Sequence, residues 1–224
     1  MSLVNEWQIA QTWGGCTAVL KGIMGGIQPQ RIVECGCGVY STPILRNPSG
    51  HLLSIEHDQH WIKKIQKRFP PDTFHEYSVF PLSGINNGKD PKTIEPKILQ
   101  SLRDFYNQLA ENWKPFDFLM VDTYRCARVP AALALASKAK YVMLHDTRPY
   151  SRDYYEYHKL NNMFKDWFRY EHRPEGKINK IHLIPWTTLY SREPLELKNL
   201  QPFVIEESLR LWNMETPLEL MHGS

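Results

Sequence analysis

Short apolar runs alternate along this chain with longer segments in which apolar residues recur every three or four positions. Apolar runs of this length are typical of buried strands, and the longer periodicity is typical of helices that pack one face on a core. This alternation favours an α/β fold, in which helices cover both faces of a mostly parallel sheet. The predicted strands are 31–35, 52–56, 75–80, 116–122 and 141–146.

Turn and capping residues set the bounds of the other elements. A short helix should begin after Ser41, because Pro43 fits a first helical turn. Pro81–Lys92 is rich in Gly, Asn and Pro and is predicted to be a loop, and Ile178–Trp186 is predicted to be strand material. The tail from Pro194 is partly helical, and its position on the sheet is left open. The remaining predicted helices are 5–27, 59–68, 94–112, 130–139 and 154–170.

The length of the chain and of its apolar runs limits how many domains it can form and whether it can span a membrane. Its 224 residues are enough for one α/β domain with a substantial core. We expect that domain over residues 1–190, beginning with a helical segment, and an extension over 191–224 that packs on it or is partly disordered. No apolar run approaches the length that spans a bilayer, and Met1–Trp7 lacks the basic start and apolar middle of a signal peptide. We therefore expect a cytoplasmic protein with no membrane partner.

The charge balance and the spacing of the cysteines argue against two further functions, nucleic-acid binding and metal binding by paired cysteines. The chain has 27 basic and 24 acidic residues, a net charge of +3, which is not typical of a nucleic-acid-binding protein. Cys16, Cys35, Cys37 and Cys126 show no metal-type spacing and are expected to fill tight space in the core. The sequence leaves open whether the chain forms a homodimer.

The segment from Arg31 to Thr42 is the most informative in the chain. An apolar strand ends in Glu34-Cys-Gly-Cys-Gly38 and is followed by small hydroxyl residues. Glycine allows a sharp turn and a close approach of backbone to a ligand, because it has no side chain in the way. This loop is therefore a candidate ligand-binding loop.

Acidic residues follow three more of the predicted strands. They are Glu56, which is followed by His57, then Asp122, and Asp146, which is preceded by His145. In an open α/β sheet, ligands bind beyond the carboxyl ends of the strands, so these groups are expected at one site.

The loop and Glu56 together suggest a nucleoside cofactor. A carboxylate 20 residues after Gly36 can accept hydrogen bonds from both ribose hydroxyls, in NAD as well as in other adenosine cofactors. A dinucleotide loop requires a third glycine, and Ser41 stands in that place here. Negative charge at Glu34 is unfavourable next to a diphosphate and favourable next to the amino group and sulfonium of S-adenosylmethionine. The loop therefore favours S-adenosylmethionine.

These residues resemble those of a known family. Glu34-Cys-Gly-Cys-Gly-Val-Tyr-Ser-Thr42 and Ser54-Ile-Glu-His-Asp58, followed by Trp61, resemble the first two motifs of class I, Rossmann-like, S-adenosylmethionine-dependent methyltransferases. The resemblance implies a mostly parallel sheet of seven strands. It also implies that the glycine loop and the second-strand acid hold the cofactor. The candidate cofactor-binding residues are Glu34, Gly36, Gly38, Ser41, Glu56 and His57.

The later strand ends resemble two narrower groups. Met120-Val-Asp-Thr-Tyr-Arg125 and Leu144-His-Asp-Thr-Arg-Pro-Tyr150 are similar to motifs of glucuronoxylan O-methyltransferases and of metal-dependent small-molecule and sugar O-methyltransferases. The second group holds Mg²⁺ on acids that correspond to Asp122 and Asp146. Thr147 stands where that group has Asn, and the usual acid after the third strand is missing.

The candidate catalytic residues are Asp122, His145 and Asp146. Two converging carboxylates suit Mg²⁺, which would bind the acceptor hydroxyl and lower its pKa. Without a metal, His145 or Asp146 could take the proton as general base. In the simpler alternative, Asp146 caps a turn and His145 is a half-buried residue with its hydrogen bonds satisfied.

The function predicted from these features is S-adenosylmethionine-dependent O-methylation of a small-molecule or saccharide hydroxyl. The aromatic and basic segment Arg148–Tyr157 is a candidate acceptor surface. Two alternatives remain at this stage, a non-catalytic binding or assembly protein with the same fold and a nicotinamide-dependent oxidoreductase.

Overall fold

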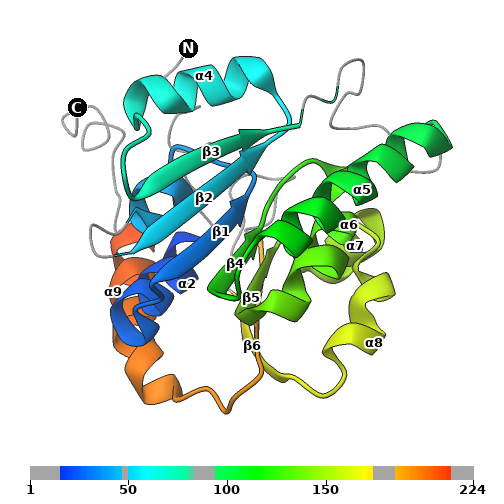
Figure 1. Cartoon of the computed structure of the whole chain (residues 1–224). Helices are drawn as coiled ribbons and strands as arrows, with labels where there is room; N and C mark the ends of the chain where they lie inside the picture. Colours follow the sequence, from blue (N-terminus) through cyan, green and yellow to red (C-terminus); the bar gives the residue numbers. More distant parts are fainter. Residues whose placement is uncertain (1–15, 47–49, 81, 83–93, 174–184, 213–224) are drawn as a thin grey trace.

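A single mixed sheet organises the molecule in the computed structural model, which describes residues 16–46, 50–80, 82, 94–173 and 185–212. The described residues form seven strands in the order β3-β2-β1-β4-β5-β7-β6 (Figure 1). Every neighbouring pair is parallel except the two that involve β7. The predicted fold class is confirmed. The strands are β1 Arg31–Cys35, β2 His51–Glu56, β3 His75–Val79, β4 Phe116–Val121, β5 Ala139–His145, β6 Phe168–His172 and β7 Thr187–Ser191.

Strand order reverses at β1, which lies between β2 and β4. The register pairs Cys35 with Ile55 on one side and with Val121 on the other, and Val121 pairs with Leu144. The residues that follow these positions therefore lie at the same edge of the sheet. This edge, at a reversal of strand order, is where open α/β sheets bind ligands.

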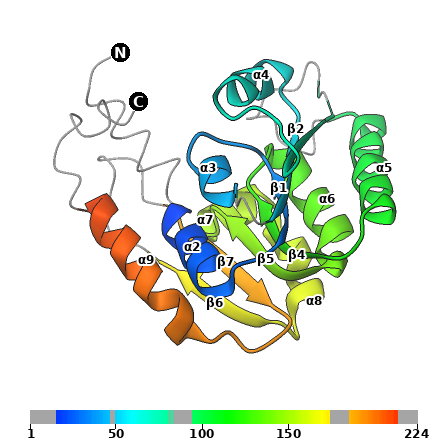
Figure 2. The same ribbon diagram turned by 60° about the vertical axis from the view of Figure 1, so that its left-hand side comes forward.

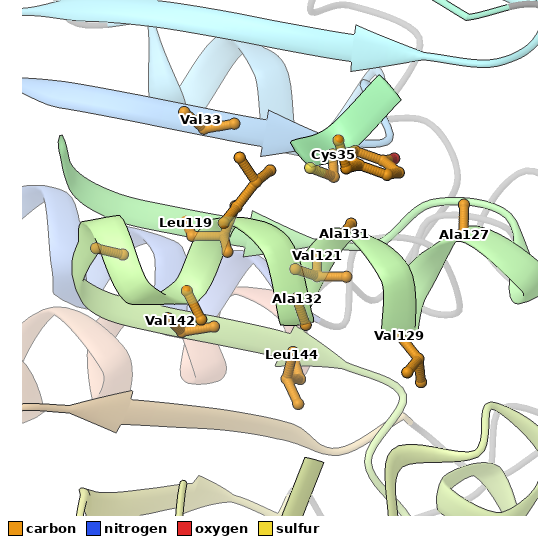
Figure 3. Close-up of a cluster of buried hydrophobic side chains, with 14 of the residues drawn as sticks. Val33, Cys35, Leu119, Val121, Ala127, Val129, Ala131, Ala132, Val142 and Leu144 are labelled. Carbon is orange, nitrogen blue, oxygen red and sulfur yellow. The ribbon is translucent and has the colours of Figure 1, made fainter. Parts of the chain in front are cut away.

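Helices cover both faces of the sheet. Helices α5 (Pro96–Asn112) and α6 (Arg125–Leu135) lie on one face, while α2 (Thr17–Gly22) and α9 (Leu197–Trp212) lie side by side on the other (Figures 1 and 2). Successive strand residues point to opposite faces. Val33 accordingly packs in the α5–α6 core, part of which Figure 3 shows, and Ile32 packs in the α2–α9 core.

Elements with local sequence signals match their predicted bounds closely. Helix α4 spans Gln59–Arg68, as predicted, because the Asp58 side chain caps its first turn and Pro70 follows its end. Helix α3 spans Ser41–Leu45 and carries Pro43 in its first turn. The strands predicted at 31–35, 52–56, 75–80, 116–122 and 141–146 are each confirmed to within two residues at either end.

The helix predicted at 130–139 is wrong in its bounds. Helix α6 begins at Arg125 and contains Pro130, and the three residues Ala136–Lys138 form a 3-10 turn before β5. The prediction used the preference of proline for a first helical turn. Burial of Cys126, Ala127 and Val129 against the sheet outweighs that preference.

The single helix predicted at 154–170 is also wrong. Helix α7 (Pro149–Tyr154), a 3-10 turn (Tyr157–Leu160) and helix α8 (Asn161–Phe164) precede β6. Glu156 interrupts the helix with a left-handed φ of 59°. Strand β6 then pairs with β7, the next strand along the chain, and helical periodicity does not reveal that pairing.

The described residues place the tail that the sequence left without a position. Helix α9 packs on α2 and on the π-helical turn Ile23–Ile27 that continues it. Predictions for residues 5–15, 178–184 and 213–224, and for nearly all of Pro81–Lys92, fall outside the described residues. None of the helices in the described part of the chain combines the length and the apolar character needed to cross a membrane.

Candidate active site

The carboxyl ends of β1, β2, β4 and β5 surround a cavity of about 490 Å³. It lies at the edge where the strand order reverses, which the fold makes the expected ligand position. Glu34 and His57 are not among the residues that line it. The predicted site residues that do line it are Gly36, Gly38, Ser41, Glu56, Asp122, His145 and Asp146.

Gly36 holds the loop after β1 against the end of β4. Its φ of 93° lies in the left-handed region, and a Cβ added there would be 2.0 Å from the backbone oxygen of Asp122. A Cβ added at Gly38 would meet only Ser41 Oγ, at 3.3 Å. Trp61 Nε1 donates a hydrogen bond of 2.8 Å to the Cys37 carbonyl and ties the loop to α4. Backbone packing thus requires glycine at position 36, and the glycine at 38 leaves space beside the cavity.

Glu34 supports the loop from beneath. Its fully buried carboxylate accepts hydrogen bonds from the hydroxyls of Ser41 (2.5 Å), Thr42 (2.9 Å) and Ser54 (2.7 Å). Burial raises the pKa of Glu34 to about 7, although these hydrogen bonds favour the ionised form. The Thr42 hydroxyl also accepts from the backbone N–H of Gly38 at 3.0 Å. Any effect of Glu34 on a ligand therefore passes through Ser41 and the loop.

Glu56 lies at the end of β2 and faces the cavity. Its Oε1 accepts hydrogen bonds from the backbone N–H groups of His57 (2.7 Å) and Asp58 (3.0 Å). The Cys37 thiol lies 3.7 Å from Oε2. Burial raises the pKa of Glu56 above its ordinary value. The two backbone bonds fix the carboxylate in a position to accept further hydrogen bonds from a ligand.

The side chain of His57 is held inside the protein. Its Nδ1 lies 2.8 Å from the Phe80 carbonyl oxygen, and its Nε2 lies 2.8 Å from the Tyr106 hydroxyl. Burial lowers the pKa of His57 to about 4, so the ring is neutral at neutral pH. The ring joins β2 to α5, and the Glu56 carboxylate, not the His57 ring, faces the cavity.

Arg128, on α6, connects the ends of β4 and β5. Its buried guanidinium donates from Nη2 to Asp122 Oδ1 at 2.7 Å and to Asp146 Oδ2 at 3.4 Å. Nε donates to the Thr123 carbonyl at 2.8 Å, and Nη1 donates to the His145 carbonyl at 2.9 Å. The two acids predicted to be catalytic therefore share one fixed positive charge.

Asp146 is held in an unusual conformation at this site. Its φ of 59° is left-handed, which asparagine and aspartate tolerate better than most residues. Burial alone would raise the pKa of Asp146, but the charges of His145 and Arg128 hold it below its ordinary value. The Tyr155 hydroxyl donates to Oδ2 at 3.3 Å. Asp146 is therefore a stable carboxylate at neutral pH.

These residues do not fit a magnesium ion held jointly by Asp122 and Asp146. Mg²⁺ requires near-octahedral oxygen ligands, and the Arg128 guanidinium already bonds to both carboxylates. A dication between the same oxygens would meet that positive charge directly. The chemistry of this site therefore does not rest on an ion held between these two carboxylates.

The sequence prediction missed Arg128 and Tyr155. Arg128 stands among buried apolar residues of α6, and an arginine inside an apolar helix pattern was the signal that could have revealed it. Tyr155 was noted only as part of an aromatic segment. Its ring lies against the guanidinium of Arg128, with Cζ 3.8 Å from the ring centroid.

Comparisons with known proteins agree with the fold. No family model matches the chain, and no curated protein matches its sequence. A methyltransferase-like protein from Silicibacter pomeroyi is 19% identical, with 88% of this chain and 93% of that chain covered and a TM-score of 0.50. Human methyltransferase-like protein 13, in complex with SAH, is 15% identical, with 89% and 90% covered and a TM-score of 0.47. The N-methyltransferase NodS from Bradyrhizobium japonicum WM9, in complex with S-adenosyl-L-homocysteine, is 9% identical, with 77% and 85% covered and a TM-score of 0.48.

The likeness to the Silicibacter protein shows the fold alone. This chain has the Rossmann-like fold of class I methyltransferases, with the seven strands in the order described above. Its activity has to be argued from its own cavity.

Proposed function

We propose that this protein is an S-adenosylmethionine-dependent methyltransferase. The observation that carries the proposal is the cavity of about 490 Å³ at the reversal of strand order, bounded by the Gly36–Gly38 loop and by Glu56. Both lie at the edge of the sheet where strand order reverses, which is where open α/β sheets bind ligands.

The residues of the cavity suit this cofactor. Glu56 would accept hydrogen bonds from the ribose, and the open loop at Gly38 would allow close approach of the cofactor to the backbone. Acidic side chains at Glu56, Asp58, Asp122 and Asp146 favour a ligand that carries positive charge. When bound, the cofactor supplies an activated methyl group, so alignment of the acceptor provides much of the rate.

The acceptor in this proposal is a hydroxyl of a small molecule or saccharide. Asp146 stays ionised and could accept the hydrogen bond of such a hydroxyl. His145 lines the cavity beside it, with Nε2 3.8 Å from Asp146 Oδ1, and would take the proton as general base. Arg128 would hold the Asp122 and Asp146 carboxylates in place while the acceptor binds.

Titration calorimetry tests the cofactor. We expect heat with S-adenosylmethionine and S-adenosylhomocysteine and none with NAD. Glu56→Ala should weaken binding by about 1–3 kcal/mol, because the ribose loses its acceptor. Glu76→Ala is the matched control, since it removes an exposed acid from the neighbouring strand β3. A folded sample that binds NAD and neither sulfur nucleoside would favour the oxidoreductase alternative.

Methyl transfer is tested by measuring release of S-adenosylhomocysteine with a panel of hydroxyl-bearing small molecules and sugars. His145→Gln and Asp146→Asn should reduce turnover at least tenfold and leave S-adenosylhomocysteine affinity within about twofold, since this product carries no sulfonium charge and neither residue is assigned to the ribose. Cofactor binding without turnover on any acceptor would instead support the non-catalytic binding alternative. The cytoplasmic location and the homodimer stay predictions.

A further inference from the structure

Three potential metal ligands of different chemistry meet beside the cavity. The ligand atoms of Cys16, Asp122 and His145 all lie within 4.8 Å of one another. Cys16 directly precedes α2, Asp122 follows β4, and His145 ends β5. The fold brings them together because α2 and its π-helical continuation run back toward the start of β1. The beginning of α2 therefore lies near the carboxyl edge of the sheet (Figure 2).

Neighbouring side chains hold two of the three groups in place, the ring of His145 and the carboxylate of Asp122. Thr187 Oγ1 lies 3.1 Å from Nδ1 of His145, and Nε2 lies 3.8 Å from Asp146 Oδ1, too far for a hydrogen bond, so Nε2 can serve as a metal ligand. Such contacts to the second ring nitrogen are usual for histidines that bind metals. Arg128 bonds to Oδ1 of Asp122, so a metal ion would have to bind the other oxygen, Oδ2, to avoid competing with the guanidinium. The side chains of Cys16 and His145 are only 1% and 3% exposed, which excludes bulk water from this side.

We propose that Cys16, Asp122 and His145 form a binding site for a borderline-soft divalent ion of the Zn²⁺ class. A thiolate, an imidazole and a carboxylate are ligands that zinc accepts, whereas magnesium avoids sulfur and nitrogen. Three protein ligands leave a fourth tetrahedral position, and Asp122 and His145 open that position to the cavity. This ligand set differs from the Asp122–Asp146 pair. An ion bound there would occupy Nε2 of His145, so the general-base role proposed above for His145 belongs to the protein without the ion.

The present spacing requires only a small closure. Ligand atoms around a tetrahedral zinc are separated by roughly 3.3–3.7 Å, given bond lengths of about 2.0–2.3 Å. The ligand atoms here lie within 4.8 Å of one another, so side-chain movements of about 1 Å would bring them to the spacing of a tetrahedral zinc site.

Cobalt spectroscopy tests the site, because Co²⁺ replaces Zn²⁺ and reports both thiolate ligation and tetrahedral geometry. The full chain, first treated with a chelator, is titrated with Co²⁺. We expect one ion per chain, a thiolate-to-cobalt charge-transfer band and intense tetrahedral bands, all displaced by Zn²⁺ and unaffected by excess Mg²⁺. Cys16→Ser should remove the charge-transfer band. Cys126→Ser should keep it, since Cys126 is a second buried cysteine, on α6 and outside the cluster.

A second pair of variants avoids changing the ligands. Thr187→Val should weaken Co²⁺ binding by on the order of 10–100-fold, because His145 loses its orienting partner. Thr188→Val is the matched control, as Thr188 is also buried in β7 but bonds to Thr147.

Circular dichroism confirms folding of each variant. Absence of the charge-transfer band in folded wild-type protein, its survival in Cys16→Ser, or its loss in Cys126→Ser alone would overturn the proposal. These measurements contain no methyl acceptor or cofactor, so their outcome is independent of the proposed methyltransferase activity.

Discussion

At the scale of single residues, Arg128 offsets the negative charges of the two acids of the cavity, Asp122 and Asp146. Its guanidinium is 6% exposed, and it pairs with carboxylates that are about one-fifth exposed, 23% for Asp122 and 22% for Asp146. Removing one partner of such a pair leaves uncompensated charge in a site of low polarity. Arg128 is therefore a positioning residue whose loss should affect stability before it affects any ligand.

We predict that Arg128→Met lowers the free energy of unfolding by about 3 kcal/mol, as measured by urea denaturation. Adding Asp122→Asn in the same chain should recover part of that loss, because the second change removes one of the unpaired charges. Arg152→Met serves as control, since the side chain of Arg152 makes an exposed contact to Asn161 and should change stability by less than about 0.5 kcal/mol. Equal effects at the two arginines would contradict this account.

Glu34 should give the protein a measurable pH dependence. Its folded pKa of about 7 lies above the ordinary 4.5, so the folded state binds this proton more tightly than the unfolded state does. The associated stability is fully present below pH 4.5 and is lost as the pH rises through about 7. The difference corresponds to about 3 kcal/mol at 1.36 kcal/mol per pKa unit.

Glu34→Gln should abolish that part of the profile. Between pH 4.5 and about 7, the free energy of unfolding of wild type should fall relative to the variant, as followed by urea denaturation at a series of pH values. The buried His57, with a folded pKa of about 4, titrates in the opposite sense, but it does so in both proteins and cancels in the comparison. Parallel profiles would mean that Glu34 is ionised in the folded protein throughout this range.

The sequence predicted the positions of some residues of the site and missed the roles of others. The missed roles depend on partners that lie far away in the sequence. Gly36, Glu56 and Asp122 could be placed beside the cavity because each lies at the end of a strand that is visible in the sequence. The roles of Glu34 and Arg128 depend on partners elsewhere in the fold, such as Ser54 and Asp146. The same limit applied to Cys16, which the sequence predicted only as a small residue that fills space.

At the scale of elements, capping and turn residues predicted the bounds of a helix where they lie close to it in the sequence. Helix α4 matches its predicted bounds because its capping residue, Asp58, and the prolines that end it lie close to the helix in the sequence. The segment 154–170 failed because β6 forms through pairing with β7, and helical periodicity carries no information on that pairing. Helix α9 could not be placed because it packs on α2 and on the turn that continues α2, which lie near the other end of the sequence.

Helix α9 should contribute strongly to stability through one buried face. Leu200 is 3% exposed and packs in the α2–α9 core, while Ile205 on the same helix is 56% exposed. Leu200→Ala should lower the free energy of unfolding by about 2–5 kcal/mol, and Ile205→Ala by less than about 0.5 kcal/mol, as measured by denaturant unfolding. Similar small effects of both substitutions would show that α9 is not docked on α2 in solution.

At the scale of the whole molecule, the charge of the cavity opposes the charge of the chain. The protein carries a net charge of +3, yet among the described residues the cavity is lined by Glu56, Asp58, Asp122 and Asp146 against the single arginine Arg128. A local excess of acid attracts a cationic ligand more than a neutral one of the same shape. The two sulfur nucleosides provide that comparison, since S-adenosylmethionine carries a sulfonium charge that S-adenosylhomocysteine lacks.

We therefore predict that salt weakens S-adenosylmethionine binding more than S-adenosylhomocysteine binding. Raising the ionic strength from about 0.01 M to about 1 M shortens the screening length from about 30 Å to about 3 Å, and the ratio of the two affinities should shift by roughly 3–10-fold toward the neutral ligand. Titration calorimetry at both salt concentrations measures this ratio. Asp146→Asn should reduce the shift, because it removes one of the cavity's negative charges and leaves the ribose acceptor Glu56 in place. Identical salt dependence of the two ligands would mean that the sulfonium charge is not bound near these acids, and the methyl group would then lie elsewhere in the cavity.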